Sequence, residues 1–368
     1  MKINGRQYQA IWLATDGWSV DIIDQTKLPH VFETIRLSTL QDAAHAIRTM
    51  QVRGAPLIGV TAAYGLCLAL RHDASDSGLD HAVTLLASQR PTAVNLRWAL
   101  EEMRRAVRNV PRDARVPAAY ARATRMAHED VETNRSIGEH GLRVLEDLLA
   151  RKKPGARLNV LTHCNAGWLA AVDWGTATAP IYKAHDNALP IHVWVDETRP
   201  RNQGAALTAF ELAAHGVPHT IIVDNAGGHL MQRGEVDIVI VGADRVTANG
   251  DAANKIGTYL KALAARDTGV PFYVALPYST IDWSLDSGDK IPIEERSADE
   301  VLCMTGRTAG GDVVTVQIAP HGSPAANPAF DVTPSRLITG LITERGVAAA
   351  SANGLLSLYP ERGTAGMT

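Results

Sequence analysis

Cysteine is scarce in this sequence, and its copies lie far apart. The 368 residues contain three cysteines, Cys67, Cys164 and Cys303, and none of them belongs to a CxxC pair. This pattern argues against a disulfide framework and against a cysteine zinc site, and it fits a reducing compartment. We therefore expect a cytoplasmic protein without a bound metal.

Long apolar segments and an excess of positive charge are also lacking. No apolar run reaches the roughly 18 residues of a membrane-spanning helix, and the polar N-terminal stretch shows no secretory signal. The net charge of −3 does not suggest a large basic surface. Neither a membrane nor a nucleic acid is an expected partner. The nucleotide-binding fingerprints, GxGxxG after the first strand and GxxxxGK[ST], are missing as well.

The composition is that of a folded protein, with 46% hydrophobic and 20% charged residues. The length exceeds what one compact core usually supports, so we expect two domains. Residues 1–134 are predicted to form a smaller, mainly helical N-terminal domain. It opens with a strand around Trp12–Ile23 that is broken at Asp16-Gly17, and a long helix between Arg112 and Glu132 is expected to lead out of it.

One helix of this first domain is marked by its apolar spacing. Its apolar residues recur at steps of three and four, which is typical of an amphipathic helix. Asn95 is a suitable N-cap residue, and Pro111 ends the pattern. The stripe consists of Leu96, Leu100, Met103, Val107 and Val110.

Residues 135–368 alternate between short apolar runs and helical patterns. Such runs are typical of parallel strands in a sheet that is covered on both faces. We predict an α/β fold with a Rossmann-like parallel sheet in this C-terminal domain. The predicted strands are Leu158–Leu161, Ile191–Val195, Thr220–Val223, Ile238–Val241 and Phe272–Leu276.

Polar residues and glycines follow each of these predicted strands. In a doubly wound sheet, ligands bind at the carboxyl ends of the strands, so these residues together predict a polar crevice. Cys164 follows the first strand, and Asp244 follows the fourth. Asn254 and Lys255 come soon after Asp244, near the predicted start of a helix, where anions bind favourably.

Each of these residues has a structural and a chemical interpretation. Cys164 is either a small buried residue or a reactive thiol, which a nearby helix N-terminus would favour as thiolate. A pair with His163 is not expected, because adjacent residues on an extended segment point to opposite faces. Asp244 is either a cap or ion-pair partner, or a general acid whose pKa is raised by burial. Lys255 is otherwise a surface lysine, and Gly227-Gly228 is either a phosphate-binding loop or a turn.

The first domain offers two candidate phosphate sites. Arg53-Gly54-Ala55-Pro56 places an arginine before a proline that opens an apolar helix, and Arg90 precedes the amphipathic helix described above. Taken singly, each pattern is more often ordinary helix capping.

Seven motifs together carry a resemblance to a known family. They are VRGAPLIGV, RPTAVNL, LTHCNAG, DETRPRNQGAALTAFEL, DNAGG, GADRVTANGDAANKIGTYLKALAA and PFYVALPYSTID, in this order. The sequence resembles the methylthioribose-1-phosphate isomerases from about Ile23 to about Gly346. Their superfamily also includes the regulatory subunits of the translation-initiation guanine-nucleotide exchange factor.

The resemblance implies an aldose-ketose isomerase of methionine salvage that converts 5-methylthioribose 1-phosphate to 5-methylthioribulose 1-phosphate. It implies Asp244 as proton donor and Cys164 as a residue that stabilises the transition state or transfers a proton. It also implies a homodimer without metal or organic cofactor, and a small phosphorylated sugar as substrate. The substrate-binding residues that it implies are Arg53, Gly54, Ala55, Arg90, Gln203, Asn254 and Lys255.

Several alternatives stay open at this point. The substrate could instead be a related pentose phosphate, 5-deoxyribose 1-phosphate or ribose 1,5-bisphosphate, with Arg199 and Arg201 near a second phosphate. A non-catalytic regulatory subunit that senses sugar phosphates or nucleotides is a further alternative. The hydrogen at C2 could move to C1 as a proton or as a hydride. Trp168 could pack in the core or narrow the pocket.

Overall fold

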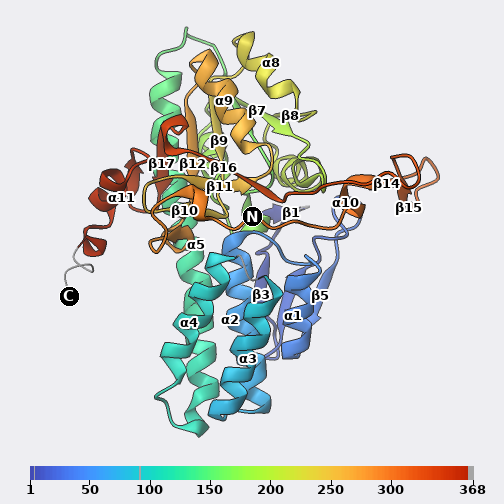
Figure 1. Cartoon of the computed structure of the whole chain (residues 1–368), viewed down its shortest axis with the longest axis vertical. Helices are drawn as coiled ribbons and strands as arrows, with labels where there is room; N and C mark the ends of the chain where they lie inside the picture. Colours follow the sequence, from blue (N-terminus) through green and yellow to red (C-terminus); the bar gives the residue numbers. More distant parts are fainter. Residues whose placement is uncertain (4, 91–92, 364–368) are drawn as a thin grey trace.

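The structure is a computed structural model, and it describes residues 1–3, 5–90 and 93–363. A helical N-terminal part lies against one side of a large α/β part (Figure 1). Among the described residues, no helix combines the length and the apolarity needed to cross a membrane.

The N-terminal part is built around one buried helix, α2 (Ala55–His72), on which the helices around it and the long helix that follows them pack. Its start is fixed by Gly54 at the N-cap and by Pro56 in the first turn, as the sequence predicts. The helices around it are α1 (Leu40–Arg48), α3 (Asp76–Gln89) and α4 (Val94–Val107). The short strands of this part are β1 (Lys2–Ile3), β2 (Arg6–Gln7), β3 (Ile11–Leu13), β4 (Val20–Ile23) and β5 (Thr34–Leu37).

Two details of this part bear on the sequence predictions, namely the strand at residues 12–23 and the N-cap at Asn95. The predicted strand at residues 12–23 is a hairpin of β3 and β4, and its break at Asp16 is confirmed, since that carboxylate accepts the N–H groups of Trp18 and Ser19. The prediction of Asn95 as N-cap is wrong, because Ala93 holds that position. The Asn95 side chain instead donates to Ser279 Oγ at 2.8 Å and ties α4 to the C-terminal part.

Helix α5 (Arg115–Leu149) connects the two parts. It is longer than the predicted helix, so the expected division between residues 134 and 135 falls inside it. Glycines on its second half allow close contact with α6 (Ala179–Asp186): a Cβ on Gly141 would lie 2.2 Å from Pro180 Cγ. This long helix therefore packs on both the helical bundle and the large sheet.

The C-terminal part contains a seven-stranded sheet in the order β18-β17-β12-β9-β6-β7-β8. All neighbouring pairs are parallel except β17 and β18, which confirms the predicted Rossmann-like sheet. The order of the sheet reverses between β6 and β9, and such a switch point is where doubly wound folds bind ligands. The strands are β6 (Leu158–Thr162), β7 (Ile191–Asp196), β8 (His219–Ile222), β9 (Ile238–Val241), β12 (Phe272–Ala275), β17 (Gly340–Thr343) and β18 (Gly346–Ala348).

The remaining helices and strands surround this sheet. A smaller four-stranded sheet, in the order β13-β10-β11-β16, lies beside it and is formed by β10 (Arg245–Thr247), β11 (Ala252–Lys255), β13 (Ile281–Asp282) and β16 (Phe330–Thr333). The helices of this part not yet named are α7 (Ala209–His215), α8 (Ala226–Gln232), α9 (Thr258–Thr268), α10 (Asp299–Leu302) and α11 (Ala352–Leu358). Helices α8 and α9 pack on each other. A π-helical turn covers Gly204–Thr208.

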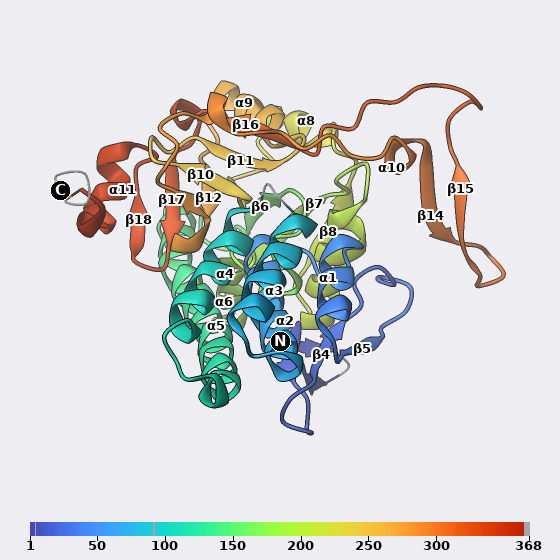
Figure 2. The same cartoon turned by 60° about the horizontal axis from the view of Figure 1, so that its bottom comes forward.

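Two further features of the fold bear on function. Strands β14 (Cys303–Arg307) and β15 (Val313–Gln317) form a hairpin that projects from the body of the molecule (Figure 2). The core is continuous between the two parts of the chain: residues of α2, α4 and α5 belong to the same buried cluster as one face of the large sheet, including Val160 and Ile240. The other face of the sheet has a separate buried cluster.

Candidate active site

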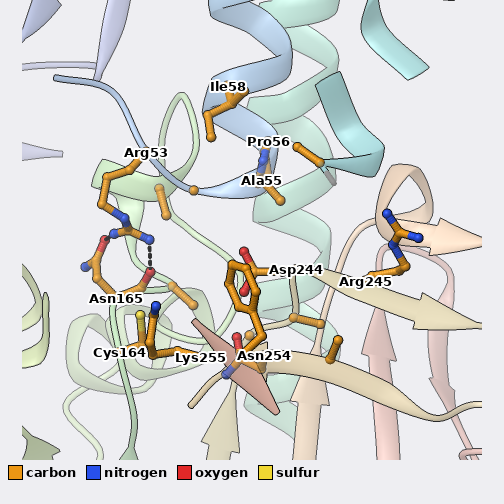
Figure 3. A pocket seen from close by; sticks show the side chains of 18 of the residues that line it. Arg53, Ala55, Pro56, Ile58, Cys164, Asn165, Asp244, Arg245, Asn254 and Lys255 are labelled. Carbon is orange, nitrogen blue, oxygen red and sulfur yellow. Dashed lines mark hydrogen bonds between the residues drawn. The ribbon is translucent and has the colours of Figure 1, made fainter. Parts of the chain in front are cut away.

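A pocket lies at the switch point of the large sheet, where the ends of β6 and β9 meet the start of α2 (Figure 3). All nine site residues expected from the sequence line it, although they come from separate segments of the chain. They are Arg53, Gly54, Ala55, Arg90, Cys164, Gln203, Asp244, Asn254 and Lys255.

Cys164 lies two residues beyond β6 and is 8% exposed. Burial raises the pKa of its thiol, and the positive charges of Arg53 and Lys255 only oppose that rise. The expectation of a helix N-terminus that favours the thiolate is therefore wrong, since only a single 3-10 turn, Trp168–Ala170, follows. No pair with His163 forms: the two His163 ring nitrogens face Asp196 Oδ2 and the Ile256 carbonyl oxygen, each at 2.8 Å.

Asp244 follows β9 across the crevice from Cys164 (Figure 3). Burial raises the pKa of its carboxyl group, and the ammonium of Lys255 opposes the rise. This direction agrees with the one expected for a general acid. The suggested partners are engaged elsewhere: Arg245 pairs with Asp282 at 3.3 Å, and Arg199 donates to the carbonyl oxygens of Pro200 and Val301.

Three of the predicted site residues are cations that line the same pocket. Arg53 donates to the backbone oxygen of Asn165 at 2.6 Å and also to its side-chain oxygen, which fixes the guanidinium over the loop after β6. Arg90 pairs with Glu294 at 3.6 Å. Lys255 is 6% exposed, burial lowers its pKa, and its ammonium lies 4.9 Å from the centre of the Phe330 ring. It belongs to strand β11 and not to a surface helix.

The neutral residues of the site are placed by close packing. Gly54 has a φ of +91°, and a Cβ there would lie 2.4 Å from the backbone of Ala170. Only glycine therefore allows the start of α2 to approach the loop after β6. Gln203 is buried, and its Oε1 has no hydrogen-bond partner within the described chain. This oxygen is available to a ligand hydroxyl group.

The sequence reasoning missed the residues that support the pocket. Arg296 lines it and is held by Glu300, with nitrogen–oxygen distances of 2.9–3.2 Å. It lies in an irregular segment, where neither strand ends nor helical spacing gave a signal. Glu211 is fully buried and accepts hydrogen bonds from Asn165 and from the backbone N–H groups of Trp168 and Leu169. Glu211 lies near the end of the motif DETRPRNQGAALTAFEL, and this membership was the only hint in the sequence that it supports the site.

One group of possible metal ligands lies beside the pocket. His163, Asp196 and Asp224 bring three ligand atoms within 4.8 Å of one another. The ammonium of Lys261 lies 3.1 Å from Asp196 Oδ2 and donates to the Asp224 carbonyl oxygen at 2.5 Å. A cation of the chain itself therefore already occupies this position.

Two of the open alternatives are decided by packing. Trp168 is 1% exposed and belongs to the buried core, and it is not among the described residues that line the pocket. Gly227 and Gly228 lie in the first turn of α8. A Cβ on Gly227 would lie 3.1 Å from Leu161 and 3.2 Å from Lys261, so this glycine serves close packing rather than a phosphate loop.

Comparisons with known proteins show to which family the chain belongs. The Initiation factor 2 subunit family matches residues 51–350. Methylthioribose-1-phosphate isomerases from Sinorhizobium medicae and Methylobacterium nodulans are 64% and 65% identical over 98% of this chain, covering 100% and 99% of those proteins.

Solved structures extend the comparison to the fold. The crystal structure of 5-methylthioribose 1-phosphate isomerase from Pyrococcus horikoshii is 41% identical, with a TM-score of 0.83 and 97% of each chain covered. That of translation initiation factor eIF-2B, subunit delta, from A. fulgidus is 38% identical, with a TM-score of 0.78, and covers 96% of this chain and 100% of that one. Since the relatives of 64% identity extend over nearly the full length, the chain belongs to the methylthioribose-1-phosphate isomerase family.

Proposed function

We propose that the chain is an aldose-ketose isomerase that converts 5-methylthioribose 1-phosphate to 5-methylthioribulose 1-phosphate in methionine salvage. One observation carries the proposal for this pocket: a carboxyl group and a thiol follow the two strands at the switch point and face a set of cations. This arrangement suits a small sugar that carries a phosphate dianion. The relatives described above bear the name of this enzyme.

The residues have separate roles in the proposed reaction. Arg53, Arg90 and Lys255 hold the phosphate, which orients the sugar and lowers the barrier. Asp244 donates its proton to the ring oxygen as the bond from that oxygen to C1 breaks, while the phosphate stays attached to C1. The hydrogen at C2 then moves to C1, and the C2 hydroxyl proton returns to the Asp244 carboxylate as the ketone forms. Cys164 contacts the reacting carbons.

Apolar residues in the pocket lining favour the methylthio substituent at C5. They are Ile58, Pro277, Ile291, Ile293 and Phe330. A second phosphate would need a second set of cations, for which Arg199 and Arg201 were the candidates. Arg199 and Arg201 are not among the described lining residues, and Arg201 pairs with Glu300 at 2.9 Å.

Turnover of 5-methylthioribose 1-phosphate by the purified protein tests this proposal. Replacing the proposed acid, Asp244→Asn, should preserve substrate binding and lower kcat by about 10²–10⁴-fold, the usual contribution of general acid catalysis. Asp267→Asn on the exposed face of α9 is the matched control. Wild-type kcat in Asp244→Asn would remove Asp244 from the mechanism. Turnover of 5-deoxyribose 1-phosphate alone would favour the related pentose phosphate, and turnover of neither sugar would favour a regulatory subunit.

We further propose that the chain acts as a homodimer in the cytoplasm. All three cysteines are free thiols, which suits a reducing compartment. The β14–β15 hairpin exposes Val314, Val316 and Ile318 on one face, and an isolated two-stranded hairpin is marginally stable in water. The exposed side chains of Ile221 and Val223, at the β8 edge of the sheet, offer a matching apolar surface on a second copy.

Light scattering on the purified protein tests the dimer. The wild type should have twice the mass of the chain, and Val314→Asp combined with Val316→Asp should shift it toward the monomer. Gln317→Glu, on the opposite face of the same hairpin, is the control that should leave the dimer intact. A monomeric wild type would contradict the proposed dimer.

A further inference from the structure

The backbone of Cys164 adopts an unusual conformation. Its φ is +66°, in the left-handed region that residues with a side chain seldom enter. Such conformations persist only where the surroundings fix them, and they occur often at functional sites. The cause must therefore lie in the groups that contact the two peptide units around Cys164.

Two buried threonines make those contacts. The Cys164 N–H donates to Thr198 Oγ1 at 2.8 Å, and Thr208 Oγ1 donates to the Cys164 carbonyl oxygen at 2.7 Å. Both threonines are 0% exposed. The Thr198 hydroxyl itself donates to the Asp196 carbonyl oxygen at 3.0 Å, which leaves its lone pairs for the Cys164 N–H. Each threonine hydroxyl therefore donates to one carbonyl oxygen, that of Asp196 for Thr198 and that of Cys164 for Thr208.

Thr208 has a second contact, which extends its influence to the phosphate site. Its hydroxyl accepts a hydrogen bond from Asn165 Nδ2 at 3.2 Å, and the two oxygens of Asn165 accept from Arg53. Thr208 ends the π-helical turn Gly204–Thr208, and turns of this kind are frequent at functional sites. Thr198 has no corresponding contact with Asn165 or Arg53 among the hydrogen bonds of the described chain.

We propose that Thr198 and Thr208 are positioning residues: their hydroxyl groups hold Cys164 in the left-handed conformation that directs its thiol into the pocket. Thr208 also positions Arg53 through Asn165. The kinetic part of this proposal rests on the proposed function, in which Cys164 contacts the reacting carbons. The structural part concerns the placement of the thiol alone.

Kinetics of isosteric variants test the positioning roles. Thr198→Val and Thr208→Val remove the hydroxyl, and each should lower kcat by about 10–100-fold, since small displacements of reacting groups cost about that much. Only Thr208→Val should also raise KM several-fold, because it alone loses the support of Arg53. Thr198→Ser and Thr208→Ser keep the hydroxyl and should stay within about threefold of the wild type.

A matched control separates positioning from a general loss of stability. Thr61→Val removes a buried hydroxyl that bonds a backbone carbonyl within α2, away from the pocket lining, and should leave kcat and KM unchanged. Folded Thr198→Val and Thr208→Val variants with wild-type kcat would overturn the proposal. If one valine variant does not fold, the alanine variant of the same threonine, which also lacks the hydroxyl, and the valine variant of the other threonine still decide.

Thiol chemistry provides a readout that needs no turnover. Alkylation of Cys164 by iodoacetamide, followed by mass spectrometry, should be at least about threefold faster in both valine variants, because the released thiol leaves its buried position. Unchanged alkylation rates in both would overturn the positioning role. If the wild type does not turn over the sugar phosphate but the alkylation rates change as expected, the proposed function fails and the placement of the thiol stands.

Discussion

Burial raises the pKa of the Cys164 thiol above its ordinary value, so in the proposed reaction we expect Cys164 to act as a thiol. A protonated thiol is a poor base for the hydrogen at C2, so we expect that hydrogen to move directly to C1 as a hydride. Turnover in D2O should therefore give product without deuterium at C1, as measured by NMR. Product incubated in D2O without enzyme corrects for spontaneous exchange. Deuterium at C1 would instead indicate that the hydrogen leaves as a proton.

Glu211 gives the protein a pH-dependent stability. Burial raises the pKa of this carboxyl group to about 7, from 4.5. A carboxyl whose pKa is raised in the folded state stabilises the fold below its unfolded pKa and loses that contribution as pH rises through the folded pKa. The loss between about pH 4.5 and 7 amounts to at most about 3 kcal/mol.

The variant Glu211→Gln cannot titrate, so its free energy of unfolding should lack this decline. Urea unfolding at pH 5 and pH 8 measures the difference from the wild type. The free energy of unfolding of the variant, relative to that of the wild type, should be lower at pH 5 than at pH 8. An equal difference at both pH values would contradict the raised pKa of Glu211. Glu361→Gln, at an exposed position, is the control.

At the scale of elements, α5 and α6 depend on glycine for their contact. A Cβ on Gly141 would lie 2.2 Å from the Pro180 ring, which cannot rotate away. Gly141→Ala should therefore destabilise the protein by about 1–3 kcal/mol in urea unfolding, despite the better helix propensity of alanine. Gly306→Ala, where no heavy atom lies within 4 Å of the new Cβ, should change stability little. Equal stabilities would show that the two helices separate without cost.

The strands of the parallel sheet could be predicted because each is a short run of consecutive apolar residues in the sequence. Strand β9 has the predicted bounds, β8 is shifted by one residue at both ends, and the other predicted strands differ by one residue at one end. The polar residues behind them followed from topology. Thr198, Thr208 and Glu211 could not be predicted as supports of the site, because their hydrogen bonds join segments that only the folded chain brings together. The prediction of Asn95 as N-cap was wrong because its side chain bonds to Ser279, which is distant in the sequence, and not to the first N–H groups of its own helix.

At the scale of the whole molecule, the shared core makes the two parts of the chain one unit of unfolding. The pocket also takes residues from both parts. Calorimetry should therefore show one transition, and product at about 100 times its Kd should add about 2.7 kcal/mol to the free energy of unfolding. Lys255→Met should abolish this gain. Two transitions, of which only one responds to product, would contradict a single cooperative unit.

The ring of cations at the pocket has a consequence for the cell. The molecule carries a net charge of −3, yet Arg53, Arg90, Lys255 and Arg296 gather at one crevice. A phosphorylated metabolite is therefore drawn to this region, and its rate of encounter falls as ionic strength rises. If these cations hold the substrate phosphate as proposed, free inorganic phosphate, which also carries a dianion, should compete for them. The flux through this step should therefore slow when a cell is rich in phosphate and recover when phosphate becomes limiting.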